Sequence, residues 1–213
     1  MAKAALIGVL GLSYSSFLKC HPENLLKLFN TVNRGVVENP KPQYPASSWM
    51  SVMEIAEMRG RGFYTHFGTP RLILESSAAV VNLPITNPSY GSYSIPYDLS
   101  VHYEDEVREV VENVLKEVER RPVIASISAI DRFLHYRPDI RCEIYKAVDV
   151  GIGEILEALK DFVLFSPYGE PMGEEGFHES HGVYLSTMPR PRERDTVKLR
   201  DLGLLFLSML HSR

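Results

Sequence analysis

Residues 122–139 read PVIASISAIDRFLHYRPD, and this stretch decides the fold. The run Val123–Ile127 predicts a buried parallel strand, because its residues are apolar or small. Asp131 and His135 follow in what we expect to be the first turns of a helix, where a spacing of four places both side chains on one face. Ligands and metals bind beyond the carboxyl ends of the strands in α/β sheets. A capping carboxylate beside a surface histidine explains the same spacing without a function.

Short apolar segments alternate with amphipathic helical patterns on both sides of this stretch. We expect strands at residues 4–10, 34–38, 62–66, 80–83, 162–165 and 183–186. We expect helices at residues 22–32, 47–58, 104–120, 140–160 and 196–210, with Ser47 as the N-cap of the second. This alternation predicts an α/β, three-layer, mostly parallel sheet with helices on both faces. The length of 213 residues suits a single domain spanning 1–213.

The composition excludes several classes of partner. The chain has 23 Lys and Arg against 27 Asp and Glu, which argues against a nucleic acid polymer or an anionic membrane as partner. No segment approaches the ~20 apolar residues of a membrane span. Cys20 and Cys142 form no CxxC pattern, so we expect neither a disulfide framework nor a cysteine zinc site. A reducing, cytoplasmic setting fits this expectation.

Six stretches in order carry a family resemblance. They are LIGVLGL (6–12), YPASSWMSVMEIA (44–56), AVVNLPITNP (79–88), AIDRFLHYRPD with IYKAVDVGIGEILEAL (129–159), VLFSPYGE (163–170) and GFHESHGVYLS (176–186). Together they resemble the type I phosphodiesterase/nucleotide pyrophosphatase family of the alkaline phosphatase superfamily. The resemblance covers nearly the whole chain and implies an alkaline-phosphatase-like fold. The chain is short for that family and leaves no room for an inserted cap domain.

The resemblance also implies one metal site. Family members hold two metal ions, commonly zinc, and one ion is bound by an Asp and a His four residues apart plus a distant His. The matching residues here are Asp131, His135 and His178, with His181 as the alternative third ligand. One zinc ion with a fourth position open to water is a valid arrangement for these ligands.

The second metal set and the nucleophile of the family have no matching residues. The first-strand Asp position is Leu10, and the SDHG turn reads Ser166-Pro167-Tyr168-Gly169. The nucleophile position lies within residues 43–47, where we assign it to Pro45. Two-metal phosphoryl transfer needs both ions. The resemblance therefore implies a catalytically inactive binding or assembly module with a nucleotide or phosphoester ligand. The alternative is a one-metal phosphoesterase, so enzymatic activity stays open.

Three further features keep alternatives open. Serines of the second helix could replace the nucleophile, namely Ser47, Ser48 and Ser51. Acidic residues of the 166–181 loop could supply a replacement carboxylate, namely Glu170, Glu174, Glu175 and Glu179. The loop from Pro84 to Asp98 is the candidate lid. A homo-oligomer is compatible with the sequence.

Overall fold

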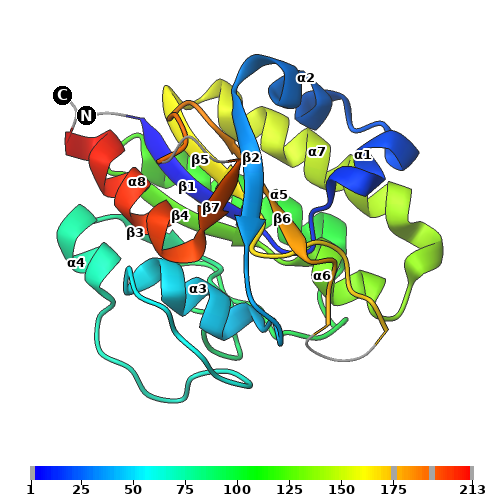
Figure 1. Ribbon diagram of the computed structural model, residues 1–213, viewed down its shortest axis with the longest axis horizontal. Helices are drawn as coiled ribbons and strands as arrows, with labels where there is room; N and C mark the ends of the chain where they lie inside the picture. Colours follow the sequence, from blue (N-terminus) through cyan, green and yellow to red (C-terminus); the bar gives the residue numbers. More distant parts are fainter. Residues whose placement is uncertain (1–2, 174–176, 192–194, 212–213) are drawn as a thin grey trace.

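The computed structural model describes residues 3–173, 177–191 and 195–211, and a seven-stranded sheet forms its centre (Figure 1). The strand order is β3-β4-β1-β5-β6-β2-β7. β6 runs antiparallel to its neighbours β5 and β2, and the other neighbouring pairs are parallel. The predicted mostly parallel sheet is therefore confirmed. The strands are β1 Ala4–Val9, β2 Asn33–Glu38, β3 Ala79–Val81, β4 Val123–Ile127, β5 Asp161–Phe165, β6 His181–Ser186 and β7 Thr196–Lys198.

Helices cover both faces of the sheet, as the alternating pattern predicted (Figure 1). The first face carries α1 Tyr14–Cys20, α2 Glu23–Thr31, α5 Tyr103–Val118, α6 Ala129–Leu134 and α7 Arg141–Glu157. The second face carries α3 Pro45–Met53, α4 Arg71–Ser76 and α8 Leu199–His211. A single-turn 3-10 helix, Pro138–Ile140, leads into α7.

The central strand β1 shows why the apolar runs are continuous. Ala5 and Ile7 pack into the hydrophobic cluster that α5 and α7 share. Ala4 and Leu6 point the other way, into the cluster with α3 and α8. Successive side chains of a strand alternate between faces, so a strand covered on both faces needs apolar residues at every position.

Two local predictions were wrong. Ser47 is not an N-cap, because α3 begins at Pro45 and its N-cap is Tyr44. Proline suits the first helical position, where its fixed φ and missing N–H cost nothing, and it moves the start of the helix two residues upstream. Residues 62–66 form no strand, and Gly62 has a φ of +104°, which is incompatible with an extended segment.

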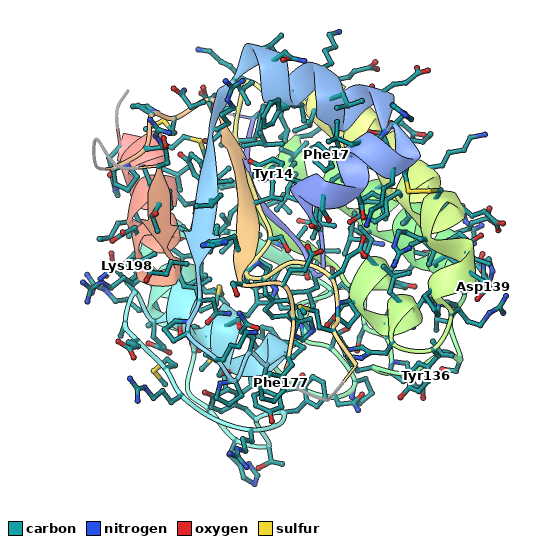
Figure 2. All side chains as sticks on the ribbon, turned by 45° about the vertical axis from the view of Figure 1, so that its right-hand side comes forward. Tyr14, Phe17, Tyr136, Asp139, Phe177 and Lys198 are labelled. Atoms are coloured by element: carbon teal, nitrogen blue, oxygen red, sulfur yellow. A yellow bond between two sulfur atoms is a disulfide. The ribbon has the colours of Figure 1, made fainter. Side chains whose placement is uncertain are left out.

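The expectation about the cysteines was also wrong. Cys20 and Cys142 form a disulfide bond, drawn in yellow in Figure 2, with their Cα atoms 4.9 Å apart. Cys20 ends α1 and Cys142 is the second residue of α7, and the fold packs these helices against each other. The two residues are separated by 122 positions in the sequence, so no local pattern indicates the pairing. Within the described parts of the chain, no helix is both long and apolar enough to cross a membrane.

Tyr14→Phe will change how stability depends on high pH. The Tyr14 hydroxyl donates to the carbonyl oxygens of Gly35 (2.8 Å) and Tyr184 (3.1 Å), and burial raises its pKa to about 12. The folded state therefore holds this proton more tightly than the unfolded chain. The contribution of this proton to the free energy of unfolding is complete below pH ~10 and is lost as the pH rises towards 12.

Urea unfolding of both proteins at pH 8 and pH 11 measures this contribution. The free energy of unfolding should fall by about 1.4 kcal/mol more in wild type than in Tyr14→Phe between these two pH values. The reason is that Tyr14 titrates near pH ~10 in the unfolded chain but holds its proton longer in the folded protein. Equal losses in the two proteins would show that Tyr14 does not titrate as its burial implies. Tyr136→Phe, at a residue that is 71% exposed, is the control and should behave like wild type.

Candidate metal centre

The carboxyl-end edge of the sheet brings three predicted ligands together. Asp131 lies on α6, directly after β4, and His135 is the C-cap of that helix. His178 lies in the loop between β5 and β6. One potential ligand atom from each residue lies within 4.8 Å of the other two. The structure thus assembles Asp131, His135 and His178 as a possible metal site.

The distances from the two histidines to Asp131 suit a shared metal ion after a small adjustment. The Nε2 atom of His135 lies 3.5 Å from Oδ1 of Asp131, and the Nε2 atom of His178 lies 2.8 Å from the same oxygen. Two ligands of a tetrahedral zinc ion, each ~2.0–2.1 Å from it, are about 3.3 Å apart. The His135 pair already has this separation, whereas the His178 pair needs to open by about 0.5 Å.

His181 lies outside this group. It is the exposed first residue of β6 and pairs with Glu38 of β2 in the sheet register. His178, by contrast, has only 2% of its side chain accessible. The geometry therefore favours His178 over His181 as the third ligand.

The backbone around Gly11 allows α6 to approach the end of β1. Gly11 has a φ of +78°, and a Cβ atom there would lie 3.1 Å from the backbone nitrogen of Asp131. A left-handed residue without a side chain is needed in such a turn. The sequence Leu10-Gly11 after β1 therefore helps to place Asp131 at the edge of the sheet.

Two tyrosines that the sequence did not single out as partners of Asp131 complete its surroundings. The hydroxyl groups of Tyr97 and Tyr168 both donate to Oδ2 of Asp131, the second at 3.1 Å. Tyr97 comes from the predicted lid loop, and Tyr168 from the turn after β5. Burial, followed by the charge of Asp131, raises the pKa of both tyrosines well above the ordinary value. Both therefore stay neutral hydrogen-bond donors.

The Asp131 carboxyl group is ionised despite being 1% exposed. Burial alone raises its pKa, but hydrogen bonds and charge interactions with His135 and His178 more than offset this, and the pKa lies well below the ordinary value. A buried, ionised carboxylate beside two imidazoles is a donor set that zinc accepts. The residues present therefore fit a divalent metal ion.

One ring nitrogen of His178 lacks a hydrogen-bond partner among the described residues. Its ring lies against that of Tyr168 with 4.0 Å between centroids, and its backbone N–H donates to Oε1 of Gln43 at 3.3 Å. Its Nδ1 atom is buried and has no hydrogen-bond partner among the described residues. Histidines that bind metals usually donate this second nitrogen's proton to an acceptor. We therefore expect weaker binding than in a structural zinc site.

The acidic loop that carries His178 is fastened to α1 and α7. Glu170 accepts a hydrogen bond from the Ser16 hydroxyl and pairs with Nε of Arg141 at 2.9 Å. Glu179 accepts from the hydroxyl groups of Ser13 and Ser15. Both carboxylates are therefore engaged away from the candidate ligands. Glu174 and Glu175, the other two candidates for a replacement carboxylate, lie outside the described residues.

Apolar and hydroxyl groups stand at the positions that the resemblance assigned to a second metal set. The side chain of Leu10 is fully buried, and Pro45 is the first residue of α3. The Ser166 hydroxyl donates to the carbonyl oxygen of Tyr168 and accepts from the backbone N–H of Leu12 at 3.2 Å. Within the described residues, the one group of three or more His, Cys, Asp or Glu residues that could hold a metal is Asp131, His135 and His178.

The serines of α3 are engaged by backbone groups. Ser48 donates to the Tyr44 carbonyl oxygen at 2.6 Å, and Ser51 donates to that of Ser47 at 2.8 Å. Ser47 makes a longer contact of 3.4 Å with the Tyr44 carbonyl oxygen. All three are buried. Hydrogen bonds of this kind compete with activation of a serine as a nucleophile.

A buried ion pair lies beside the candidate site. The Nη2 atom of Arg132 is 2.7 Å from Oε2 of Glu106 on α5, and both side chains are at most 1% exposed. Oε1 of Glu106 accepts from the backbone and hydroxyl of Ser128 and from Asn82. Arg132 also donates to the carbonyl oxygens of Asp98, the last residue of the predicted lid loop, and of Val101, which follows it. The pair therefore joins α5, α6 and the loop that carries Tyr97.

Tyr168→Phe will test the outer contacts of Asp131. The change removes one of two hydroxyl donors on Oδ2 and should cost about 1 kcal/mol of stability. Outer partners of a ligand orient it and tune its basicity, so zinc affinity should fall about 10-fold. Calorimetric titration with zinc, beside urea unfolding, separates the two effects. Unchanged affinity would mean that Asp131 binds no metal or needs no help from Tyr168.

The strand order and the helices on both faces match an alkaline-phosphatase-like fold. No protein-family model matches the chain, and no curated protein matches it in sequence. Solved structures do match.

An inactive variant of murine ectonucleotide pyrophosphatase/phosphodiesterase 5 in complex with AMP has a TM-score of 0.65 at 13% identity, over 99% of this chain and 95% of that chain. The PH0037 protein from Pyrococcus horikoshii has a TM-score of 0.62 at 13% identity, over 100% of this chain and 97% of that chain. Phosphonoacetate hydrolase from Sinorhizobium meliloti has a TM-score of 0.56 at 13% identity, over 79% and 56%. These similarities confirm the predicted fold.

Proposed function

We propose that the chain binds one divalent metal ion, zinc in the first instance, through Asp131, His135 and His178, and uses this centre to bind a phosphoester or nucleotide. It does so without the covalent phosphoryl transfer of the enzymes it resembles. The observation that carries the proposal is the contact set of Tyr168. This fully buried residue stands in the turn where the family has the second metal's ligands, and it hydrogen-bonds Asp131 and stacks on His178.

The residues around Tyr168 support the absence of a second ion. A tyrosine with a raised pKa is a poor metal ligand, because binding needs the deprotonated oxygen. Leu10 offers no ligand atom, and Pro45 has no nucleophilic group. The similarity to murine ectonucleotide pyrophosphatase/phosphodiesterase 5, whose structure holds AMP, suggests a nucleotide as the first ligand to try.

A one-metal phosphoesterase is the second candidate. Its supporting observation is that 23% of the His135 side chain is accessible, so the group opens towards solvent on that side. A bound zinc ion would lower the pKa of a water molecule towards ~7 and polarise a phosphoryl oxygen. Tyr97 and Tyr168 would hold the Asp131 carboxylate in one orientation from the opposite side.

Metal analysis beside a phosphodiester assay decides between these functions. The purified protein is dialysed against zinc, its metal content is measured, and turnover of bis(4-nitrophenyl) phosphate is followed. We expect one zinc ion per chain and no turnover above the background of free zinc. Turnover that is lost in Asp131→Ala would support the one-metal phosphoesterase instead. A wild-type protein without metal would contradict both candidates.

Two histidine variants make the test specific. His135→Ala alters a partly exposed residue at the end of α6, so the fold should persist while zinc affinity falls at least 100-fold. His181→Ala is the matched control, because His181 is exposed and lies outside the ligand group. It should keep full zinc binding. Zinc loss in His181→Ala with retention in His178→Ala would reverse the assignment of the third ligand.

The disulfide changes the expected compartment. The cytoplasmic expectation rested on two unpaired cysteines, and the structure pairs them. Disulfides persist in oxidising compartments and are rare in the cytosol of mesophiles. We therefore propose an oxidising location. A thiol count on protein isolated under alkylating conditions from its native source tests this, and two free thiols per chain would return the expectation to the cytoplasm.

A further inference from the structure

A pocket separate from the candidate metal centre lies on the second face of the sheet. Its volume is about 420 Å³, and it is bounded by the loop after β2, by α3, by residues 57–61 and by the start of α8. Pockets of roughly 300–1,000 Å³ hold small-molecule ligands. None of its lining residues belongs to the group of Asp131, His135 and His178.

The charge of this pocket has the opposite sign to that of the chain. Its lining includes five basic residues, Lys41, Arg59, Arg61, Lys198 and Arg200. Two acidic residues, Glu38 and Glu57, also line it, so the formal charge is five minus two, or three positive. The whole chain carries a net charge of −4. A concave basic surface on an acidic protein concentrates anions locally.

The basic side chains come from segments far apart in the sequence and meet at one rim. The Nη2 atom of Arg59 pairs with Oε1 of Glu57 at 2.8 Å. Arg59 lowers the pKa of Glu57, with smaller contributions from Arg200 and Lys198, and all four residues line the same pocket. Lys198, labelled at the surface in Figure 2, pairs with Glu38 in the sheet register.

The basic residues at the rim outnumber the acidic ones by three within the described lining. Among the described residues, none of the ion pairs includes Lys41, Arg61, Lys198 or Arg200. Arginine side chains bind phosphate groups with two parallel hydrogen bonds. Several of them around one pocket suit a ligand with more than one phosphate group.

The floor of the pocket suits the rest of such a ligand. Ser47, Ser48 and Ser51 are buried beneath the rim and belong to one side of α3. Met58 and Leu199 add apolar surface. The volume exceeds the space that two phosphate groups need, so an uncharged portion can lie against these two side chains.

We propose that this pocket binds a small molecule with at least two phosphate groups and an uncharged portion, independently of any metal ion. The basic rim holds the phosphate groups, and the floor of α3 and α8 holds the remainder. This site goes beyond the proposed function, because it shares no residue with the candidate metal centre.

Calorimetric titration of EDTA-treated protein with ADP, pyrophosphate, orthophosphate and adenosine tests the proposal. The probes separate the phosphate groups from the uncharged portion, and EDTA removes any contribution of the metal centre. We expect ADP to bind best, pyrophosphate more weakly, and orthophosphate and adenosine at least 10-fold more weakly than ADP. Affinity for ADP should fall as salt rises, since exposed cations are screened.

Variants of the pocket arginines test whether ADP binds there. Arg61→Gln with Arg200→Gln should weaken ADP binding at least 10-fold. Arg108→Gln, at an exposed arginine of α5, is the control and should bind like wild type. Equal binding of ADP by the double variant, equal binding of adenosine and ADP, or no ADP binding in 150 mM salt would each overturn the proposal. Loss of ADP binding in Asp131→Ala alone would also overturn it and would assign the nucleotide to the metal centre.

Discussion

Arg132→Met will lower the free energy of unfolding by about 3–5 kcal/mol, because it leaves the buried charge of Glu106 without its counterion. Arg132 and Glu106 are at most 1% exposed, so solvent cannot take over the role of the lost guanidinium group. Methionine fills similar space, which limits any contribution from a cavity. Urea unfolding at pH 7 measures the loss. A loss below 1 kcal/mol would show that the pair is not buried as the structure has it.

Two further variants separate the lost charge from lost packing. Glu106→Gln in the Arg132→Met background removes the unpaired charge but keeps an oxygen that can accept from Ser128, so the double variant should recover part of the stability. Arg121→Met is the matched control. Its side chain is 52% exposed and pairs with Glu117 at 3.0 Å, and ion pairs that solvent reaches contribute ~0–1 kcal/mol. A double variant less stable than Arg132→Met would point to lost packing instead.

The second large effect concerns the disulfide. Replacing both Cys20 and Cys142 by serine should lower the free energy of unfolding by about 4–5 kcal/mol, because the cross-link closes a loop of 122 positions in the unfolded chain. Thermal unfolding with and without a reductant provides a second measurement. The reductant should lower the midpoint for wild type and leave that of the double serine variant unchanged.

The disulfide variant also tests the link to the candidate site. α1 ends at Cys20 and carries Ser15 and Ser16, which bond to Glu179 and Glu170 on either side of His178. Loosening α1 should therefore weaken zinc binding as well as lower stability. If the double serine variant unfolds at the same urea concentration as wild type, the cysteines are not bonded in the protein.

Segments with strong periodicity could be predicted from the sequence. The Val123–Ile127 strand has the same bounds in the prediction and in the structure. The predicted 104–120 helix differs from α5 by one residue at its start and two at its end. A strand buried on both faces and a helix with one apolar stripe each have a sequence pattern that fits no other element. The short helices α1 and α4, of seven and six residues, have too few turns for such a pattern.

The segment 196–210 shows a second limit of predicting secondary structure from sequence. The segment 196–210 reads as one amphipathic helix, yet its first three residues form β7 against β2. Whether Thr196–Lys198 is a strand depends on the exposed edge of β2, which lies more than 150 residues earlier. Local propensity carries no information about such a neighbour.

Some residues of the candidate site could be predicted from the sequence and others could not. Asp131 and His135 are four residues apart on one element, so their proximity follows from helix geometry alone. The contribution of His178 could be suggested only through the family resemblance, because 43 residues separate it from His135. Tyr97 and Tyr168 gave no signal as partners of Asp131. Their hydrogen bonds depend on where two irregular loops cross the end of the sheet.

The Cys20–Cys142 bond also makes part of the chain a closed covalent ring. Arg59 and Arg61 lie within that ring and are exposed in a segment without regular structure. A protease that cuts after either residue would open the ring but would not release a fragment. The cut protein would keep all of its residues until the disulfide is reduced, because the bond would still join the two pieces. Electrophoresis without reductant would therefore not reveal such damage.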